Sequence, residues 1–211
     1  MTKAKKLILA SKSARRRELL EMVGIPFEIR VSDAPEDDSP LDLSGVERCG
    51  DWEDDTGVTA RVANIAVKKA QAVWAECSPA ECSGECVILA ADTVVALGDR
   101  LIGKPRDLDE ARQILRTLSG NTHRVVTVYV VTDGRRTRIR PTVSYVTFRK
   151  LADREIEAYV TGCAVLDKAG AYGIQDKAAL FVERIEGDFY NIVGLPVVWL
   201  REDLGSFGLQ V

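Results

Sequence analysis

The chain has 211 residues, of which 46% are hydrophobic and 29% are charged, as in an ordinary globular protein. This length suits one domain, or one domain with two lobes. A net charge of -3 and the lack of a membrane-length apolar run argue against a nucleic-acid or membrane partner. Five cysteines without an export signal indicate a cytoplasmic protein with reduced thiols.

The first predicted strand covers residues 6–10 and leads through Ser11 and Ser13 into a helix that ends before Gly24. Free backbone N–H groups at the start of a helix can bind an anion. Arg15 and Arg16 lie in this first turn, where cations are normally disfavoured. Two interpretations stay open at this point, a solvated basic turn or a site whose anionic ligand compensates the arginines.

A second strand is predicted over residues 26–31, and Asp33 follows it at the carboxyl edge where open α/β sheets bind ligands. Residues 34–56 are acidic and rich in turn formers, which indicates a loop. The next helix, over residues 58–74, has Lys69 on or beside its apolar face. Lys69 is therefore either a snorkelling lysine or a cation directed at a site.

Residues 87–97 form a long apolar run, typical of a buried strand, that contains one carboxylate, Asp92. An ionised group in a dry strand costs several kcal/mol (about 3 or more) unless a cation or hydrogen-bond donors meet it. A turn at residues 98–100 and a short return strand can bring Lys104 back toward Asp92. Asp92 is thus either a functional carboxylate or half of a buried ion pair.

The remaining predicted elements are helices over 107–118, 153–160 and 191–204 and strands over 123–131, 135–148 and 181–185. Asp133-Gly134 is a strong hairpin signal between two of these strands. His123 is expected to make a structural hydrogen bond, since no nucleophile accompanies it in a motif. Gln175 lies in a glycine-rich loop over residues 167–176. The alternation of helices and strands predicts a mixed α/β sheet.

The candidate residues combine positive charge with carboxylates. Arg15, Arg16, Lys69 and Lys104 suit a polyphosphate, while Asp33 and Asp92 suit Mg²⁺ or Mn²⁺. This combination indicates attack of water on a phosphoanhydride, with a carboxylate accepting the proton. The sequence contains neither a P-loop nor a dinucleotide-binding glycine motif. Cys77, Cys82 and Cys86 have a spacing that fits no common zinc site.

Six blocks of sequence, at residues 9–16, 91–93, 103–105, 118–123, 167–175 and 191–196, together resemble the Maf family. The resemblance covers nearly the whole chain in the family's order. It implies a single domain over residues 1–211, with insertions near 35–56 and 75–86. It also implies a two-lobed mixed sheet flanked by helices, similar to the inosine triphosphate pyrophosphatase (Maf/Ham1) fold, with the active-site cleft between the lobes.

The same resemblance implies a nucleoside triphosphate pyrophosphatase that releases a monophosphate and pyrophosphate. Asp92 and Lys104 correspond to catalytic residues of the family, and Asp33 and Asp92 to residues near its divalent metal. The positions that correspond to phosphate-binding residues are Ser11, Ser13, Arg15, Arg16 and Lys69.

The family divides into members acting on dTTP and UTP and members acting on 7-methyl-GTP. Arg15, Thr93 and Gln175 match the pyrimidine type. Two alternatives remain at this stage, an enzyme of the 7-methyl-GTP type and a nucleotide-sensing regulator of septum formation. The expected partner is a nucleoside triphosphate, and the oligomeric state, including a homodimer, stays open.

Overall fold

The computed structural model describes residues 5–31, 39–52, 57–79 and 84–209. The chain divides into two compact units. Unit 1 comprises Met1–Asp92, Thr127–Thr142 and Gly194–Val211, and unit 2 comprises Thr93–Val126 and Val143–Val193. Three of the four boundaries fall inside long strands, which are β4 (Cys86–Leu97), β6 (Thr122–Thr132) and β7 (Thr137–Phe148), and the fourth follows Val193.

The described strands form a mixed eight-stranded sheet with the order β2-β1-β4-β6-β7-β3, in which β5 pairs with β4 and β8 with β7. The short strands are β1 (Lys6–Leu9), β2 (Glu28–Ile29), β3 (Glu47–Arg48), β5 (Arg100–Ile102) and β8 (Val182–Glu186). The helices are α1 (Ala14–Met22), α2 (Val58–Ala75), α3 (Leu108–Leu118), α4 (Asp153–Gly162), α5 (Phe189–Val193) and α6 (Val197–Ser206). The predicted mixed α/β sheet flanked by helices is confirmed.

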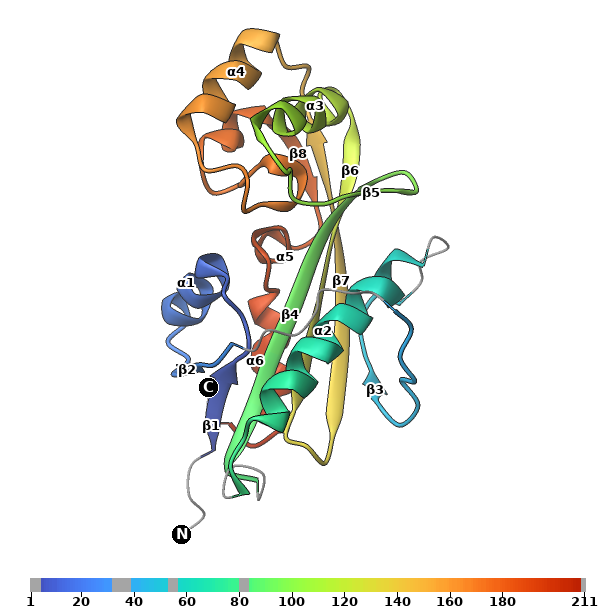
Figure 1. Cartoon of the computed structure of the whole chain (residues 1–211), viewed down its shortest axis with the longest axis vertical. Coiled ribbons are helices and arrows are strands. Elements are labelled where there is room, and N and C mark those ends of the chain that lie inside the picture. The colour runs from blue at the N-terminus through green and yellow to red at the C-terminus, as the bar shows by residue number, and fades with distance from the viewer. Residues whose placement is uncertain (1–4, 32–38, 53–56, 80–83, 210–211) are drawn as a thin grey trace. The chain divides into compact units, whose positions relative to one another are not determined.

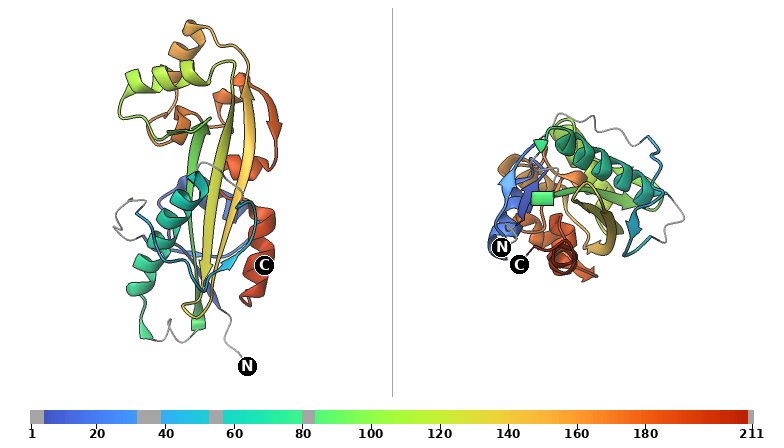
Figure 2. Two further views of the ribbon diagram at one scale, coloured as in Figure 1. Left: turned by 90° about the vertical axis from the view of Figure 1, so that its right-hand side faces the viewer. Right: turned by 90° about the horizontal axis from the view of Figure 1, so that it is seen from below.

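In unit 1, β1 and β4 form the buried centre of the sheet. The two strands are parallel, with Leu9 opposite Leu89, and their apolar side chains are at most 2% exposed. Helices α2 and α6 lie on opposite faces of this part of the sheet (Figures 1 and 2). Because both faces are covered, the strands are apolar on both sides, which is why the sequence over residues 87–91 does not alternate.

Two predicted elements differ from the structure. The helix predicted over residues 191–204 is interrupted, because α5 ends at Val193 and α6 begins at Val197. Gly194 has a φ of +126°, and Pro196 has no N–H to continue a helix. The loop predicted over residues 34–56 contains β3, which pairs in parallel with β7. Residues 32–38 and 53–56 lie outside the described part of the chain.

In unit 2, an aromatic cluster packs beneath α4 and joins residues far apart in sequence. The ring of Phe148 lies 4.9 Å from His123, 4.9 Å from Tyr172 and 5.9 Å from Phe181. His123 is 1% exposed, and its Nε2 lies 2.8 Å from the hydroxyl of Tyr172. The predicted structural role of His123 is therefore confirmed.

The predicted start of α3 is also confirmed, since the Asp107 side chain accepts a hydrogen bond from the Glu110 N–H at 2.8 Å.

The burial of His123 predicts a loss of stability in mild acid. Burial lowers the pKa of this imidazole from 6.5 to about 4, because the charged form is desolvated. Between these pH values the unfolded chain binds a proton that the folded chain does not. The contribution of the neutral His123 side chain to the free energy of unfolding is therefore fully present above pH 6.5 and is lost as the pH falls toward 4. Acidification toward pH 4 should therefore remove up to about 3 kcal/mol of unfolding free energy. Urea denaturation at pH 7, 5.5 and 4.5 measures the loss.

The control for this prediction is His123→Asn, which cannot bind a proton in this range. The variant is expected to be less stable at pH 7 but to lose less further stability on acidification. Equal pH dependence in the two proteins between pH 7 and 4.5 would show that His123 does not cause the acid sensitivity.

Candidate active site

The loop after β1 organises the start of α1 with two hydroxyl groups. Ser13 is the N-cap residue of α1, and its side chain accepts a hydrogen bond from the N–H of Arg16 at 3.4 Å. The N–H of Ser13 in turn donates to Ser11 Oγ at 3.2 Å. The backbone of Ala10 donates to the carbonyl of Leu89 at 2.8 Å, so the loop leaves the sheet beside β4. The predicted strand–turn–helix is confirmed.

The adjacent arginines Arg15 and Arg16 have different environments. Arg16 is 8% exposed, its Nε donates to the carbonyl of Gly194 at 2.9 Å, and its Nη1 donates to Ser11 Oγ at 3.1 Å. Arg16 therefore ties the loop after β1 to the segment that enters α6. Arg15 is half-buried, and Arg17 is exposed. The sequence alone treats Arg15 and Arg16 as equivalent cations.

The carboxylate of Asp92 is met by Lys69. The Lys69 Nζ lies 2.8 Å from Asp92 Oδ1, and both side chains are less than one fifth exposed, at 19% and 18%. Ala90 and Ala91, which precede Asp92, are completely buried. The predicted amphipathic helix α2 therefore does more than bury its apolar face, because it also places an ammonium group beside the carboxylate that follows the buried stretch 86–91 of β4. A partly buried pair of this kind is shielded from solvent better than a surface pair.

Unit 2 holds three of the candidate residues. Thr93 is half-buried in β4, Lys104 is exposed after β5, and Gln175 is exposed in the loop after α4. The predicted hairpin is confirmed, with Val95 opposite Ile102. Asp92 and Lys104 fall in different units, so the approach of Lys104 to Asp92 stays a prediction. Asp33 lies outside the described residues.

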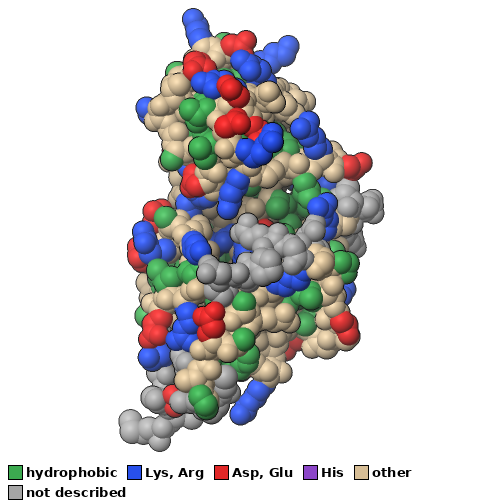
Figure 3. Space-filling model, viewed as in Figure 1, with side chains coloured by type: hydrophobic (Ala, Val, Ile, Leu, Met, Phe, Trp, Pro, Cys, Tyr) green, Lys and Arg blue, Asp and Glu red, His purple; other side chains and the backbone are tan. Residues whose placement is uncertain are grey.

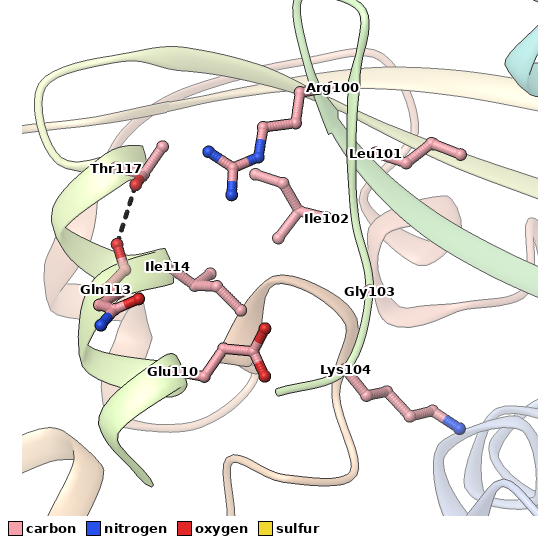
Figure 4. A pocket seen from close by; sticks show the side chains of 9 residues that line it. All are labelled: Arg100, Leu101, Ile102, Gly103, Lys104, Glu110, Gln113, Ile114 and Thr117. Atoms are coloured by element: carbon pink, nitrogen blue, oxygen red, sulfur yellow. Dashed lines mark hydrogen bonds between the residues drawn. The ribbon is translucent and has the colours of Figure 1, made fainter. Parts of the chain in front are cut away.

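A pocket of about 200 Å³ lies between β5 and α3 in unit 2. Its lining residues are Arg100, Leu101, Ile102, Gly103, Lys104, Glu110, Gln113, Ile114 and Thr117. Arg100 extends toward α3, whereas the side chain of Lys104 points away from Arg100 (Figure 4). Within the described part of the chain, the Lys104 ammonium makes no ion pair.

Charged side chains are spread over the visible surface rather than gathered by sign (Figure 3).

Within residues 5–31, 39–52, 57–79 and 84–209, no three His, Cys, Asp or Glu side chains are grouped to hold a metal ion. No helix among these residues is long and apolar enough to cross a membrane.

Comparison with known proteins decides the family. The family model described as "Maf-like protein" matches residues 6–207. The chain therefore belongs to the Maf family. This membership confirms the resemblance shown by the six sequence blocks. In the structure, these blocks lie at the ends of β1, β5, α3 and α5, within β4, and in the loop between α4 and β8.

Several Maf relatives are similar over their whole length. A protein from Bacillus cereus (strain G9842) named "dTTP/UTP pyrophosphatase" is 41% identical, covering 98% of each chain. A protein of the same name from Bacillus anthracis is 40% identical, also covering 98% of each chain. Among solved structures, the Ham1 proteins of Coxiella burnetii and Staphylococcus aureus match at TM-scores of 0.45 and 0.48 and at 12% and 11% identity. These matches cover 96% of this chain and 99% of each Ham1 chain.

The contacts of Arg16 predict that it cannot be replaced by lysine. Arg16→Lys keeps the charge but cannot donate from both Nε and Nη1, so the Gly194 carbonyl or the Ser11 hydroxyl loses its donor. We expect a loss of about 1–3 kcal/mol in the free energy of unfolding, measured by urea denaturation.

The matched control is Arg17→Lys on the same helix, where the side chain is 47% exposed and lies 3.8 Å from Glu21. This change is expected to alter the free energy of unfolding by less than about 0.5 kcal/mol. Similar losses for the two variants would contradict the structural role of Arg16.

Proposed function

We propose that the protein is a nucleoside triphosphate pyrophosphatase that hydrolyses dTTP and UTP to the monophosphate and pyrophosphate. The observation that carries the proposal is the Asp92 carboxylate, which lies beside Lys69 within β4 and directly after its buried stretch, in a Maf-family chain. Relatives that bear the name dTTP/UTP pyrophosphatase align with nearly the whole chain, which supports the choice of substrate.

In the proposed reaction, Asp92 accepts a proton from water as the water oxygen bonds to the α-phosphorus. The bond between the α-phosphorus and the oxygen bridging to the β-phosphorus breaks, and pyrophosphate leaves with that oxygen. Lys69 already places positive charge beside Asp92, where the negative charge of the triphosphate needs neutralising. Arg15 and Lys104 are proposed to bind phosphate oxygens, together with Ser11 and Ser13.

Arg16 has a structural part in this proposal, in addition to the one that the sequence indicated. Its Nε and Nη1 are already bonded to Gly194 and Ser11, so it shapes the phosphate-binding loop. The family resemblance places Arg16 among the phosphate-binding residues, and that role stays a prediction.

A divalent metal fits the donor chemistry of Asp92. Its carboxylate offers hard oxygen ligands, which Mg²⁺ and Mn²⁺ prefer, and the Lys69 ammonium contacts its Oδ1. We propose that Asp92 and Asp33 hold the ion. When bound, the ion supplies further neutralisation of charge on the phosphates.

Base selection is proposed to depend on Gln175, Thr93 and Arg15. The exposed amide of Gln175 offers both donors and an acceptor to the edge of a pyrimidine. Arg15 carries a positive charge, which would repel the cationic base of 7-methyl-GTP. A polar group left without a partner by the wrong base costs binding energy, so such contacts discriminate well.

The experiment that tests this function measures pyrophosphate release from a panel of nucleotides. The kcat/KM for dTTP and UTP is expected to exceed the values for 7-methyl-GTP and ATP by roughly tenfold or more, because the correct base pairs with the Gln175 amide. A preference for 7-methyl-GTP would place the chain in the other branch of the family. Absence of turnover with every nucleotide would contradict the proposed function itself.

The same assay contains its own controls. Gln175→Ala is expected to lower kcat/KM for dTTP more than for ATP. Reactions run with Mg²⁺, with Mn²⁺ and with EDTA test the metal, and full turnover in EDTA would contradict its proposed role.

A further inference from the structure

Gln175 lies in a tight turn formed by residues 173–176, which we call the Gln175 turn. The N–H of Asp176 donates to the carbonyl of Gly173 at 3.1 Å and closes it. Ile174 is buried, whereas Gln175 is exposed. The turn therefore exposes the Gln175 side chain to solvent, whereas Gly173 and Ile174 are buried within unit 2.

Both ends of the Gln175 turn are bonded to one phenol oxygen. Tyr159 of α4 donates its hydroxyl hydrogen to Asp176 Oδ1 at 2.8 Å and accepts a hydrogen bond from the N–H of Gly173 at 3.1 Å. Asp176 Oδ1 also accepts from the N–H of Ala178 at 2.9 Å, which caps the 3-10 helix Lys177–Phe181. A single buried hydroxyl group thus connects α4 to the start and the end of the turn.

The surroundings leave Tyr159 and the turn little freedom to move. Tyr159 is 3% exposed, and its ring lies 5.0 Å from the ring of Phe181. Burial raises the pKa of the Tyr159 hydroxyl, so it stays protonated and can donate to Asp176. At Gly173, a Cβ would lie 2.6 Å from Asp176 Oδ2 and 2.9 Å from Lys168 Cε, so a larger residue would force these side chains to shift.

We propose that Tyr159 is a positioning residue for base selection, because its hydroxyl group fixes both ends of the Gln175 turn and so sets the direction of the Gln175 amide. This inference rests on the proposed function, in which Gln175 contacts the base. Tyr159 itself acts through the turn and touches no substrate.

The proposal separates base recognition from the chemistry at the phosphates. Removing the hydroxyl group leaves the buried N–H of Gly173 without its acceptor, which loosens one end of the turn. Gln175 then adopts more orientations in the free enzyme. Substrate binding must order it, and the entropic cost of this ordering weakens binding. This ordering cost affects a nucleotide whose base pairs with Gln175. A nucleotide whose base makes no contact with Gln175 is unaffected.

The test compares four proteins, which are the wild type, Tyr159→Phe, Gln175→Ala and the double variant. In Tyr159→Phe we expect kcat/KM for dTTP to fall about 3- to 10-fold, mainly through KM, with kcat/KM for ATP within about twofold of wild type. In the Gln175→Ala background, Tyr159→Phe should have no further effect on the ratio of dTTP to ATP. This loss of effect is what distinguishes action through Gln175 from general damage.

A matched control is Tyr129→Phe in unit 1, where another buried tyrosine donates to an aspartate, Asp203, at 2.5 Å. It is expected to lower the melting temperature without changing the dTTP to ATP ratio. If Tyr159→Phe behaves in the same way, Tyr159 is only structural and the inference is wrong. If the two changes multiply in the double variant, Tyr159 does not act through Gln175, and the inference is likewise wrong.

A second measurement keeps this inference separate from the proposed function. A wild type that hydrolyses no nucleotide contradicts the proposed function and the part of Tyr159 in base selection. Amide hydrogen exchange over residues 173–178 then decides whether Tyr159 holds the turn. Faster exchange in Tyr159→Phe than in Tyr129→Phe supports the inference that the Tyr159 hydroxyl holds the Gln175 turn, and equal exchange overturns it.

Discussion

The Asp92 carboxylate directly follows a completely buried stretch of β4, and the Lys69 ammonium lies 2.8 Å from it. The charge of a carboxylate in such a place must be balanced, or its desolvation would oppose folding. Much of unit 1 contributes to this balance. Helix α2 must bury Val62, Ala66 and Ala70, because this rotation of the helix lets Lys69 reach β4. Strand β1 must also pair with β4, which covers one edge of that strand.

A second carboxylate in unit 1 shows what a purely structural arrangement looks like. Asp203 is completely buried, and it accepts hydrogen bonds from Arg138, Arg140 and the hydroxyl of Tyr129. Burial would raise its pKa, yet these donors hold the pKa below its usual range. Asp92 differs because its side chain is partly exposed. This contrast in burial supports a catalytic role for Asp92, and an active site needs a carboxylate that solvent can reach.

Most elements could be predicted from the sequence because their signals are local. The apolar run around Asp92 predicts β4, Asp107 predicts the start of α3, and Asp133-Gly134 predicts the turn between β6 and β7. These signals depend on neighbours a few positions apart, which the sequence shows directly. The interruption between α5 and α6 was missed, although Gly194 and Pro196 are visible, because the helical pattern resumes after them.

The parts of the site that could not be predicted depend on contacts between distant positions. Arg15 and Arg16 are chemically identical neighbours, and only the distant carbonyl of Gly194 makes Arg16 a buried structural residue. Tyr159 gave no signal beyond its place in a predicted helix, because its partners Gly173 and Asp176 belong to an irregular loop. In both cases one buried polar side chain shapes a loop that lies outside the regular helices and strands.

The central claim is that Asp92 accepts the proton from the attacking water, and the kcat of Asp92→Asn for dTTP hydrolysis tests it most directly. Asparagine has nearly the same shape but cannot accept this proton, and loss of a general base lowers kcat by about 10²–10⁴-fold. Asp99→Asn, in the exposed turn after β4, is the matched control and should keep the wild-type kcat. A folded Asp92→Asn protein with the wild-type kcat would contradict the account.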